Sequence, residues 1–176
     1  TERHNLQFAA KGKFSYRIII PIVKNKQLVN WTGRTVADSE DLRYKTLSTD
    51  YERSANQGLP QARLNIKDTI FDYDRLLRGG DTLVICEGPF DAIRVSFFGE
   101  RYGIVATALF SKDPLPMQVE LLCEVAPKFK RLVVLFDRDV GMSAGFAFPD
   151  YLRFRTTVLP SRVKDPAEMV FDDFCE

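Results

Sequence analysis

The stretches TLVICEGPFD (residues 82–91) and LVVLFDRD (residues 132–139) decide the fold of this chain. Each begins with five residues of strand character and then turns acidic. Neither run alternates polar with apolar residues, as a strand with one face in water would. Both runs therefore predict buried strands of a parallel sheet.

Acidic residues follow both predicted strands at their carboxyl ends. In an open parallel sheet, the residues just past a strand's carboxyl end face the crevice where ligands bind. Two such strands side by side would bring together Glu87, Asp137 and Asp139. Converged carboxylates repel one another unless cations neutralise them, and hard oxygen ligands suit Mg²⁺ or Mn²⁺. The sequence therefore predicts metal-assisted chemistry on phosphates.

Length and composition are those of a globular enzyme or enzyme fragment. The chain has 176 residues and 45% apolar content, enough to bury a core in one domain or in two small subdomains. It lacks an apolar stretch of the roughly 18 to 20 residues that span a membrane, and it starts with neither Met nor a signal-peptide pattern. We therefore expect a cytoplasmic protein, or a piece of a longer one.

Cysteine and histidine usage excludes several kinds of site. Cys86, Cys123 and Cys175 form no CxxC pair, which argues against a zinc site or a disulfide framework. His4 is the only histidine and lies near a terminus, which argues against a Ser-His-Asp mechanism and a histidine-rich metal centre.

Charge is distributed unevenly along the chain. Residues 1–80 hold 14 Lys and Arg against 9 Asp and Glu, a balance of +5, whereas residues 81–176 hold 11 against 15, a balance of −4. A basic half beside an acidic half suits a nucleic-acid channel facing metal-binding carboxylates. Taken alone, the same counts fit a scatter of solvated charges equally well.

A turn signal, RGGD (residues 78–81), predicts the boundary between a domain of residues 1–79 and one of residues 80–176. Before it, residues 16–23 and 27–36 have strand character and are joined by a short polar turn, which predicts a β-hairpin in a small α+β subdomain.

After the boundary, strand and helix patterns alternate, which indicates an α/β fold with a parallel sheet and helices on both faces. Asp113 and Pro114 are a suitable cap and first turn for the second helix. The expected strands are 82–86, 104–109, 132–136 and 156–159, and the expected helices are 91–98, 115–125, 143–152 and one from residue 166.

Two motifs in this half resemble a known domain. EGPFD (residues 87–91) follows the first buried strand, and DRDVGMSA (residues 137–144) follows the second about fifty residues later. In letters and in spacing they are similar to the EGxxD and DxDxxGxxA motifs of the topoisomerase-primase (Toprim) domain.

Flanking segments extend the resemblance over nearly the whole chain. YRIIIPI (16–22), QLVNWTGRTV (27–36) and RYKTLS (43–48) resemble the basic subdomain that precedes Toprim in bacterial-type DNA primases. LPSRVKDPAEMV (159–170) resembles the LP…DPDE segment that closes the same catalytic core. In this order, the segments resemble the catalytic core of a bacterial- or phage-type DNA primase.

The resemblance implies a nucleotidyltransferase, a DNA-directed RNA polymerase of the primase type, in a bacterial cell or a phage-infected host. It would make short RNA primers from ribonucleoside triphosphates on single-stranded DNA, with two or more Mg²⁺ or Mn²⁺ ions. Its implied partners are a replicative helicase and a zinc-binding domain outside this chain.

Site residues follow from the motifs and the resemblance together. Glu87 would bind the metal or act as general base. Arg34 follows a glycine at a strand end, and its planar guanidinium suits the geometry of a phosphate. The implied metal ligands are Glu87, Asp91, Asp137, Asp139 and Asp165, of which Glu87, Asp137 and Asp139 are the expected catalytic residues. The implied nucleic-acid or nucleotide contacts are Arg17, Arg34, Arg43 and Lys45.

The sequence departs from the primase pattern at two motifs. Thr32 replaces the first glycine of the family's GGR motif, and Ala167 stands where the closing segment often has a second acid, with only Glu168 nearby. Asp165 could equally be an ordinary helix cap before Pro166. The chain has no Walker-type loop, so these residues contain no helicase motor.

Two other functions stay open at this point. A Toprim-type nuclease would use the same acids to hydrolyse a phosphodiester, although the basic subdomain argues against it. A non-catalytic nucleic-acid-binding module would keep the fold, but clustered carboxylates without a cation would cost stability.

Overall fold

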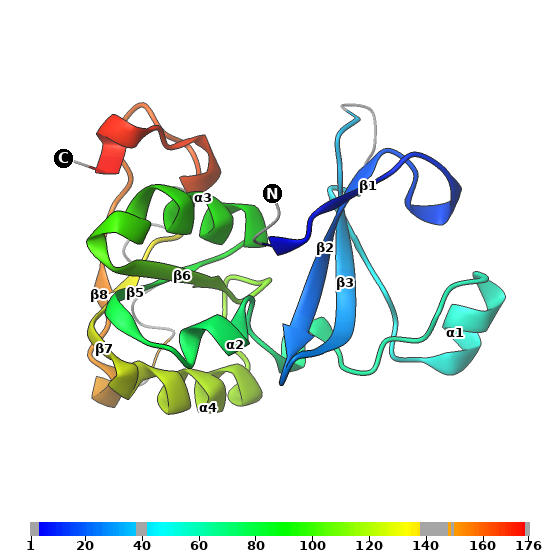
Figure 1. Cartoon of the computed structure of the whole chain (residues 1–176), viewed down its shortest axis with the longest axis horizontal. Helices are drawn as coiled ribbons and strands as arrows, with labels where there is room; N and C mark the ends of the chain where they lie inside the picture. Colours follow the sequence, from blue (N-terminus) through cyan, green and yellow to red (C-terminus); the bar gives the residue numbers. More distant parts are fainter. Residues whose placement is uncertain (1–3, 38–41, 138–147, 149, 175–176) are drawn as a thin grey trace. The chain divides into compact units, whose positions relative to one another are not determined.

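The structure is a computed structural model that describes residues 4–37, 42–137, 148 and 150–174. Its contacts divide the chain into two units, Thr1–Ile66 and Lys67–Glu176, each with its own four-stranded sheet (Figure 1). This division falls before the boundary predicted at residue 79, because the intervening residues pack with the second unit. Ile70, Tyr73 and Leu76 belong to its core.

The first unit is an antiparallel sheet with strand order β1-β2-β3-β4. The predicted hairpin is formed by the second and third strands. Asn25 and Lys26 between them have φ values of 54° and 61°, the two left-handed residues that a type I′ turn requires. The strands are β1 (Gln7–Ala9), β2 (Arg17–Lys24), β3 (Gln27–Thr35) and β4 (Tyr44–Thr46).

One face of this sheet is covered by a small apolar core. Phe14, Leu47 and Ala62 are its buried members, and Trp31 packs against them with its ring 6.4 Å from that of Phe14. Trp31 therefore lies with the core, as a lone tryptophan on a strand usually does. Gly33 is needed here because a Cβ atom would come 2.7 Å from Phe14 Cδ1.

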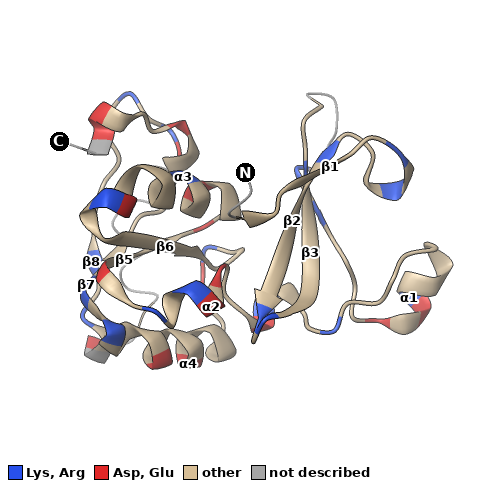
Figure 2. Cartoon of the chain, viewed as in Figure 1, with Lys and Arg blue, Asp and Glu red and all other residues tan. Residues whose placement is uncertain are grey.

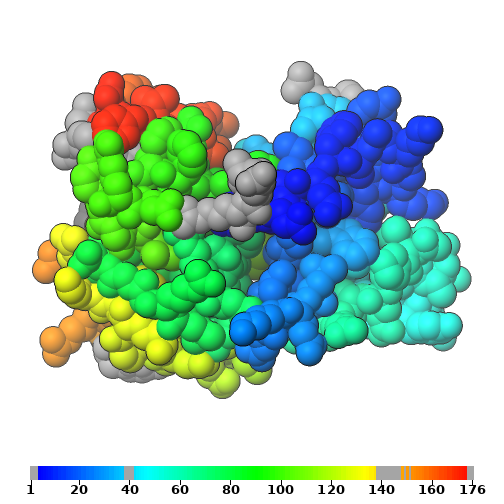
Figure 3. Space-filling model, in the orientation of Figure 1, coloured from blue at the N-terminus to red at the C-terminus, as the bar shows by residue number. Residues whose placement is uncertain are grey.

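Helix α1 (Tyr51–Asn56) is the α-helix of the first unit and lies on its surface (cyan in Figure 3). The side chain of Asp50 caps it by accepting a hydrogen bond from Arg53 N at 2.8 Å. Two short 3₁₀ helices, Gly12–Phe14 and Ile66–Asp68, complete the description of this part of the chain.

The second unit is a parallel sheet with strand order β6-β5-β7-β8. Helices α3 (Pro89–Gly99) and α4 (Pro116–Val125) cover its opposite faces (Figure 1). The predicted fold class is thereby confirmed. The strands are β5 (Gly80–Cys86), β6 (Ile104–Ala108), β7 (Phe129–Val134) and β8 (Arg155–Thr156).

The core of the second unit lies between its sheet and α4. Leu83 and Ile85 on β5 are fully buried there against Leu122 and Val125 of α4. On the other side, α3 is tied to the sheet by a hydrogen bond of 2.9 Å from Ala106 N to Ser96 Oγ. Alternate side chains of β5 therefore point to two faces of the sheet that are both buried. This explains why the sequence of β5 is a continuous apolar run.

The start of α4 differs from the prediction. The helix begins at Pro116, after Leu115, and not at the predicted cap Asp113 and first-turn Pro114. The reason is Gln118, which is fully buried and whose Oε1 accepts a hydrogen bond of 3.0 Å from Leu115 N. Its side chain thus satisfies the helix end that Asp113 was expected to cap.

The end of the chain also differs from the prediction. The expected helix from residue 166 is replaced by two 3₁₀ turns, Pro166–Glu168 and Phe171–Phe174. Asp173 accepts a hydrogen bond of 2.7 Å from Val170 N, so an acidic side chain takes up a backbone donor at the start of the second turn.

Most of the helix expected at 143–152 lies outside the described residues. Its described end is the 3₁₀ turn Asp150–Leu152.

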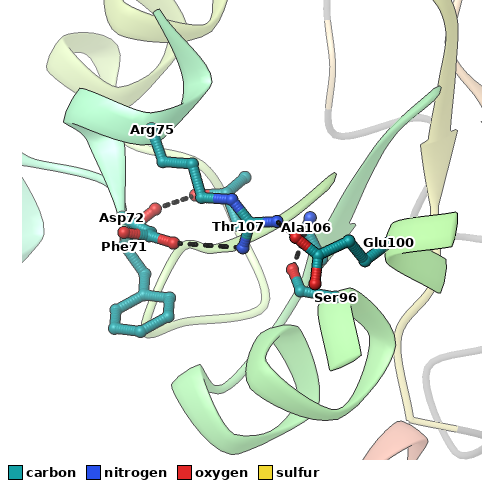
Figure 4. A network of polar contacts seen from close by, with 7 residues as sticks. All are labelled: Phe71, Asp72, Arg75, Ser96, Glu100, Ala106 and Thr107. Carbon is teal, nitrogen blue, oxygen red and sulfur yellow. Dashed lines mark hydrogen bonds and ion pairs between the residues drawn. The ribbon is translucent and has the colours of Figure 1, made fainter. Parts of the chain in front are cut away.

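A polar network fastens the segment before β5 to the sheet (Figure 4). Thr107 Oγ1 donates a hydrogen bond of 2.6 Å to Phe71 O. Arg75, on helix α2 (Tyr73–Leu76), lies 3.6 Å from Asp72 and 4.0 Å from Glu100.

A membrane-spanning helix is not found among the residues that the structure describes, since each helix there is too short or too polar.

Tyr73 gives this core a pH dependence. Burial, and then a hydrogen bond with Glu124, raise its pKa from 10.0 to about 12. Because the folded pKa lies above the unfolded one, this stabilisation is complete below about pH 10 and is lost as the pH rises toward 12. We expect Tyr73→Phe to cost about 1 kcal/mol in urea unfolding at neutral pH. The difference in the free energy of unfolding between the variant and the parent should become smaller above pH 10. A constant difference up to pH 12 would contradict the raised pKa of Tyr73.

Candidate active site

The acids predicted from the sequence follow the two central strands of the second unit. From β5 the chain passes through α3 to β6 on one side, and then through α4 to β7 on the other. The switch point of the sheet therefore lies between β5 and β7, where open α/β sheets bind their ligands. Ile85 pairs with Val134 across these strands, and Glu87 and Asp137 come shortly after.

Glu87 and Asp137 are half-buried residues with buried carboxylate oxygens, Oε2 and Oδ1 respectively. Burial, and then the negative charges of Asp91 and Asp137, raise the pKa of the Cys86 thiol. Asp91 on α3 and Asp137 after β7, two of the predicted acids, thus both act on the side chain of Cys86 at the end of β5. The backbone of Glu87 is fixed as well, because its carbonyl accepts a hydrogen bond of 2.9 Å from Phe110 N.

Asp91 is buried at the start of α3, and two backbone N–H groups donate to it. Its Oδ2 accepts from Gly88 N at 2.9 Å, which caps the helix, and its Oδ1 accepts from Ala167 N at 3.2 Å. Asp91 therefore joins α3 to the segment that carries Asp165. This geometry is that of an acid in a first helical turn, and metal binding by Asp91 stays a prediction.

Asp165 is likewise buried and acts as a cap. Its Oδ1 accepts a hydrogen bond of 3.2 Å from Glu168 N, and Glu168 Oε2 accepts one of 2.9 Å from Lys164 N. The two acids thus form a capping box around Pro166–Glu168. A metal or nucleotide contact by Asp165 stays a prediction.

The donor set suits a hard divalent cation chemically. Mg²⁺ is usually held by one or two carboxylates, with waters and substrate phosphates as its other ligands. Glu87 and Asp137 offer such oxygens, and Asp139 lies outside the described residues. Among the residues that the structure describes, no three His, Cys, Asp or Glu side chains already form a metal-binding group. The oxygens of Glu87 and Asp137 therefore fit a hard cation that takes its other ligands from elsewhere.

The predicted basic residues all lie in the first unit, in different environments. Arg17 is buried at 4% exposure, and its Nη1 lies within hydrogen-bonding distance of Gly33 O (3.1 Å), Leu42 O (3.0 Å) and Arg43 O (3.4 Å). It therefore ties β3 to the segment that enters β4. The side chain of Arg43 is exposed.

Arg34 and Lys45 are half-buried on the same sheet, each beside an aromatic ring. Arg34 Nη1 donates a hydrogen bond of 2.9 Å to Tyr44 Oη, and its Cζ lies 5.4 Å from the ring centroid. Lys45 Nζ donates one of 2.7 Å to Lys13 O and lies 5.2 Å from the ring centroid of Phe14. Both are therefore positioned by the fold.

Gln118 is a positioning residue that the sequence analysis missed. Its Nε2 donates hydrogen bonds to Leu109 O (2.7 Å) and Thr69 O (3.0 Å). Leu109 N in turn donates to Cys86 O at 3.2 Å, so this buried amide helps to fix the end of β5. A proline at the first helical position followed two residues later by Gln is a capping signal that could have revealed it.

Comparison by sequence finds no matching protein-family model and no matching curated protein. Comparison by structure does find matches. The primase of Aquifex aeolicus, with its zinc-binding and RNA polymerase domains, superposes with a TM-score of 0.61 and 22% identity over 93% of this chain and 40% of that one. A DnaG primase catalytic domain bound to single-stranded DNA gives 0.60 and 14% identity, over 92% of this chain and 52% of that one.

A phage structure shows the same similarity. The primase fragment of the bacteriophage T7 primase-helicase protein gives a TM-score of 0.51 and 18% identity over 86% of this chain and 56% of that one. The chain thus spans about half the length of the solved structures that it matches. It has the fold of the catalytic domains of bacterial and bacteriophage T7 primases.

Proposed function

We propose that this chain is the catalytic core of a DNA primase, which joins ribonucleoside triphosphates on a single-stranded DNA template. The observation that carries the proposal is the placement of Glu87 and Asp137 at the switch point of a sheet that has the primase fold. A crevice lined by carboxylates is suited to phosphate chemistry only when cations offset the repulsion between like charges.

Glu87 and Asp137 would hold Mg²⁺ or Mn²⁺, together with Asp139 two residues further along. Bound cations would supply charge neutralisation for the triphosphate and activation of the attacking 3′-hydroxyl. Glu87 would accept the proton of that 3′-hydroxyl. The hydroxyl oxygen would then form a bond to the α-phosphorus of the incoming nucleotide, while the bond from this phosphorus to the leaving pyrophosphate breaks. Asp91 and Asp165 would assist as further metal ligands. Asp91 also holds α3 against the closing segment, through the hydrogen bond from Ala167 N.

The first unit would bind the phosphates of template and nucleotide. Residues 1–66 hold eleven Lys or Arg and six acids, a balance of +5. Arg34, Arg43 and Lys45 would make the contacts. Arg17, whose guanidinium is directed at backbone carbonyls, would contribute by holding the strands that carry them.

The same proposal extends to partners and location. One similar structure is a primase bound to single-stranded DNA, and another is part of a primase-helicase. We infer that this chain works with a replicative helicase and with a zinc-binding domain, in the cytoplasm of a bacterial cell or of a phage-infected host.

A primer-synthesis assay tests the proposed function. The chain is incubated with single-stranded DNA, labelled ribonucleotides and Mg²⁺ or Mn²⁺, alone or with an annealed RNA primer. We expect weak synthesis of new primers and clearer extension of the annealed one, because a zinc-binding domain would help to choose the initiation site. Template cleavage in place of extension would indicate the nuclease. DNA binding with neither reaction would indicate the non-catalytic module.

A further inference from the structure

The closing segment and the turn after it lie along one side of α3 (red against green in Figure 1). Three side chains of α3 make contacts there, and a fourth comes from the 3₁₀ turn Glu100–Tyr102 that follows the helix. Residues spaced by three or four positions share one side of a helix. This docking face consists of Asp91, Arg94, Phe98 and Arg101.

Two hydrogen bonds join the docking face to the closing segment. Asp91 Oδ1 accepts one of 3.2 Å from Ala167 N, and Arg94 Nε donates one of 2.7 Å to Met169 O. Both bonds include a charged group, and such bonds are stronger than those between neutral groups. Met169 is buried, so little water is at hand to replace Arg94 as the donor to its carbonyl.

Aromatic rings hold the guanidinium of Arg94 in place and extend the contact along the chain. The Cζ atom of Arg94 lies 4.9 Å from the ring centroid of Phe98, and that centroid lies 6.2 Å from the one of Phe171. Arg101 completes the stack, with its Cζ 4.1 Å from the Phe171 centroid. A cation over a ring face is attracted by the negative charge of that face. The stack therefore joins α3 to the chain beyond Met169.

The position of Asp165 depends on this docking. Residues 157–165 form neither helix nor strand, so the closing segment is held in place by tertiary contacts. Asp165 is buried and caps the turn Pro166–Glu168, whose Ala167 donates its backbone hydrogen bond to Asp91. Contacts that hold this turn against α3 therefore also fix the carboxylate of Asp165.

We propose that Arg94 is a positioning residue of the metal site. Its hydrogen bond to Met169 O keeps the closing segment against α3 before a cation binds, so that Asp165 is already held beside the helix that carries Asp91. A site that is ordered in advance binds more tightly, because binding does not first have to order the segment. This inference rests on the proposed function and concerns the affinity of the site for its metal.

The test compares two variants of Arg94 that differ in one group. The amide nitrogen of Arg94→Gln lies as many bonds from the backbone as Arg Nε does, so this variant keeps the donor, whereas Arg94→Met keeps the length and has no donor. Mn²⁺ binding to the full chain is measured from the electron paramagnetic resonance signal of free Mn²⁺. We expect Arg94→Met to raise the binding midpoint roughly 10-fold, as loss of one hydrogen bond from a charged donor would, and Arg94→Gln to restore most of the affinity.

Two further measurements separate positioning from loss of fold. Nucleotide incorporation by Arg94→Met should recover as Mn²⁺ is raised to saturation, which an unfolded protein would not show. The closing segment exposes two cations, Arg162 and Lys164, after which trypsin can cleave (blue in Figure 2). Cleavage requires local opening of the segment, so Arg94→Met should be cut there faster than the parent, and Mn²⁺ should slow the cut.

Arg78→Met is the matched control, because Arg78 is an exposed cation of the second unit outside the docking face. It should bind Mn²⁺ and resist trypsin as the parent does, and an equally raised midpoint would mean that net charge, not positioning, sets the affinity.

Each other result has a separate meaning. If the parent binds Mn²⁺ and Arg94→Met binds it with the same midpoint, the role of Arg94 is refuted while the proposed function stands. If the parent binds no Mn²⁺, the proposed function fails and the inference fails with it. Should Arg94→Met melt too low for the assay, Phe171→Ala replaces it, since this change removes a ring that contacts Phe98 and Arg101. An unchanged midpoint in Phe171→Ala would overturn the inference as well.

Discussion

Asp137→Asn is expected to abolish nucleotide incorporation while the protein stays folded. The substitution keeps the size of the side chain but removes one formal charge from the switch point between β5 and β7. Because the remaining carboxylates hold a cation less firmly, we expect primer extension in Mg²⁺ to fall by about 10²- to 10³-fold. Asp139→Asn is expected to behave in the same way, on the sequence motif alone.

Stability measurements separate loss of metal from loss of fold. In the absence of metal, Asp137→Asn should melt at the same temperature as the parent or higher. Asp137 and Asp91 both raise the pKa of Cys86, so the end of β5 holds two like charges and the substitution removes one of them. The parent should be stabilised by added Mg²⁺ or Mn²⁺, and the variant should not. Glu120→Gln is the matched control, since Glu120 is exposed on α4 and the change in charge is the same. Normal incorporation by Asp137→Asn would refute the central assignment.

Where burial alone determines structure, the sequence predicted the two strands that carry the acids well. The apolar runs before Glu87 and Asp137 can be buried only as central strands, and their pairing puts both acids near one edge of the sheet. Strand order, on which the switch point depends, has no such local signal. The strand order depends on the connections through α3 and α4, which lie on opposite faces of the sheet (Figure 1).

Where distant contacts decide, the sequence carries little local information. An arginine beside a strand looks like a phosphate ligand, but the carbonyls near Arg17 belong to residues 16 to 26 positions away, so its burial could not be inferred locally. For Gln118, the local spacing signals the cap of α4, but its bonds to Leu109 and Thr69 on other elements have no local signal. In both cases tertiary hydrogen bonds determine the role of a polar side chain whose residue type allows several roles.

Replacing Arg34 and Lys45 is expected to affect binding and not chemistry. If they contact phosphates, Arg34→Ala and Lys45→Ala should each weaken single-stranded DNA binding and lower the slope of log affinity against log salt by roughly 0.7. Arg53→Ala is the matched control, because Arg53 is an exposed cation of the same unit on α1. Its removal changes the net charge equally, so a slope that fell in all three variants would indicate a general charge effect.

Asp137→Asn should show the reverse pattern in the same assays. Removing a negative charge near the phosphates leaves DNA affinity unchanged or slightly higher, whereas incorporation is lost. Arg34→Ala and Lys45→Ala should instead recover incorporation when DNA and nucleotide are raised to saturation, because the carboxylates of the second unit are intact. This crossed result follows only if phosphate binding and metal chemistry reside in different units of the chain. An unchanged salt slope in both basic variants would mean that the positive charge of the first unit is merely solvated, and the primase proposal would then depend on the acids alone.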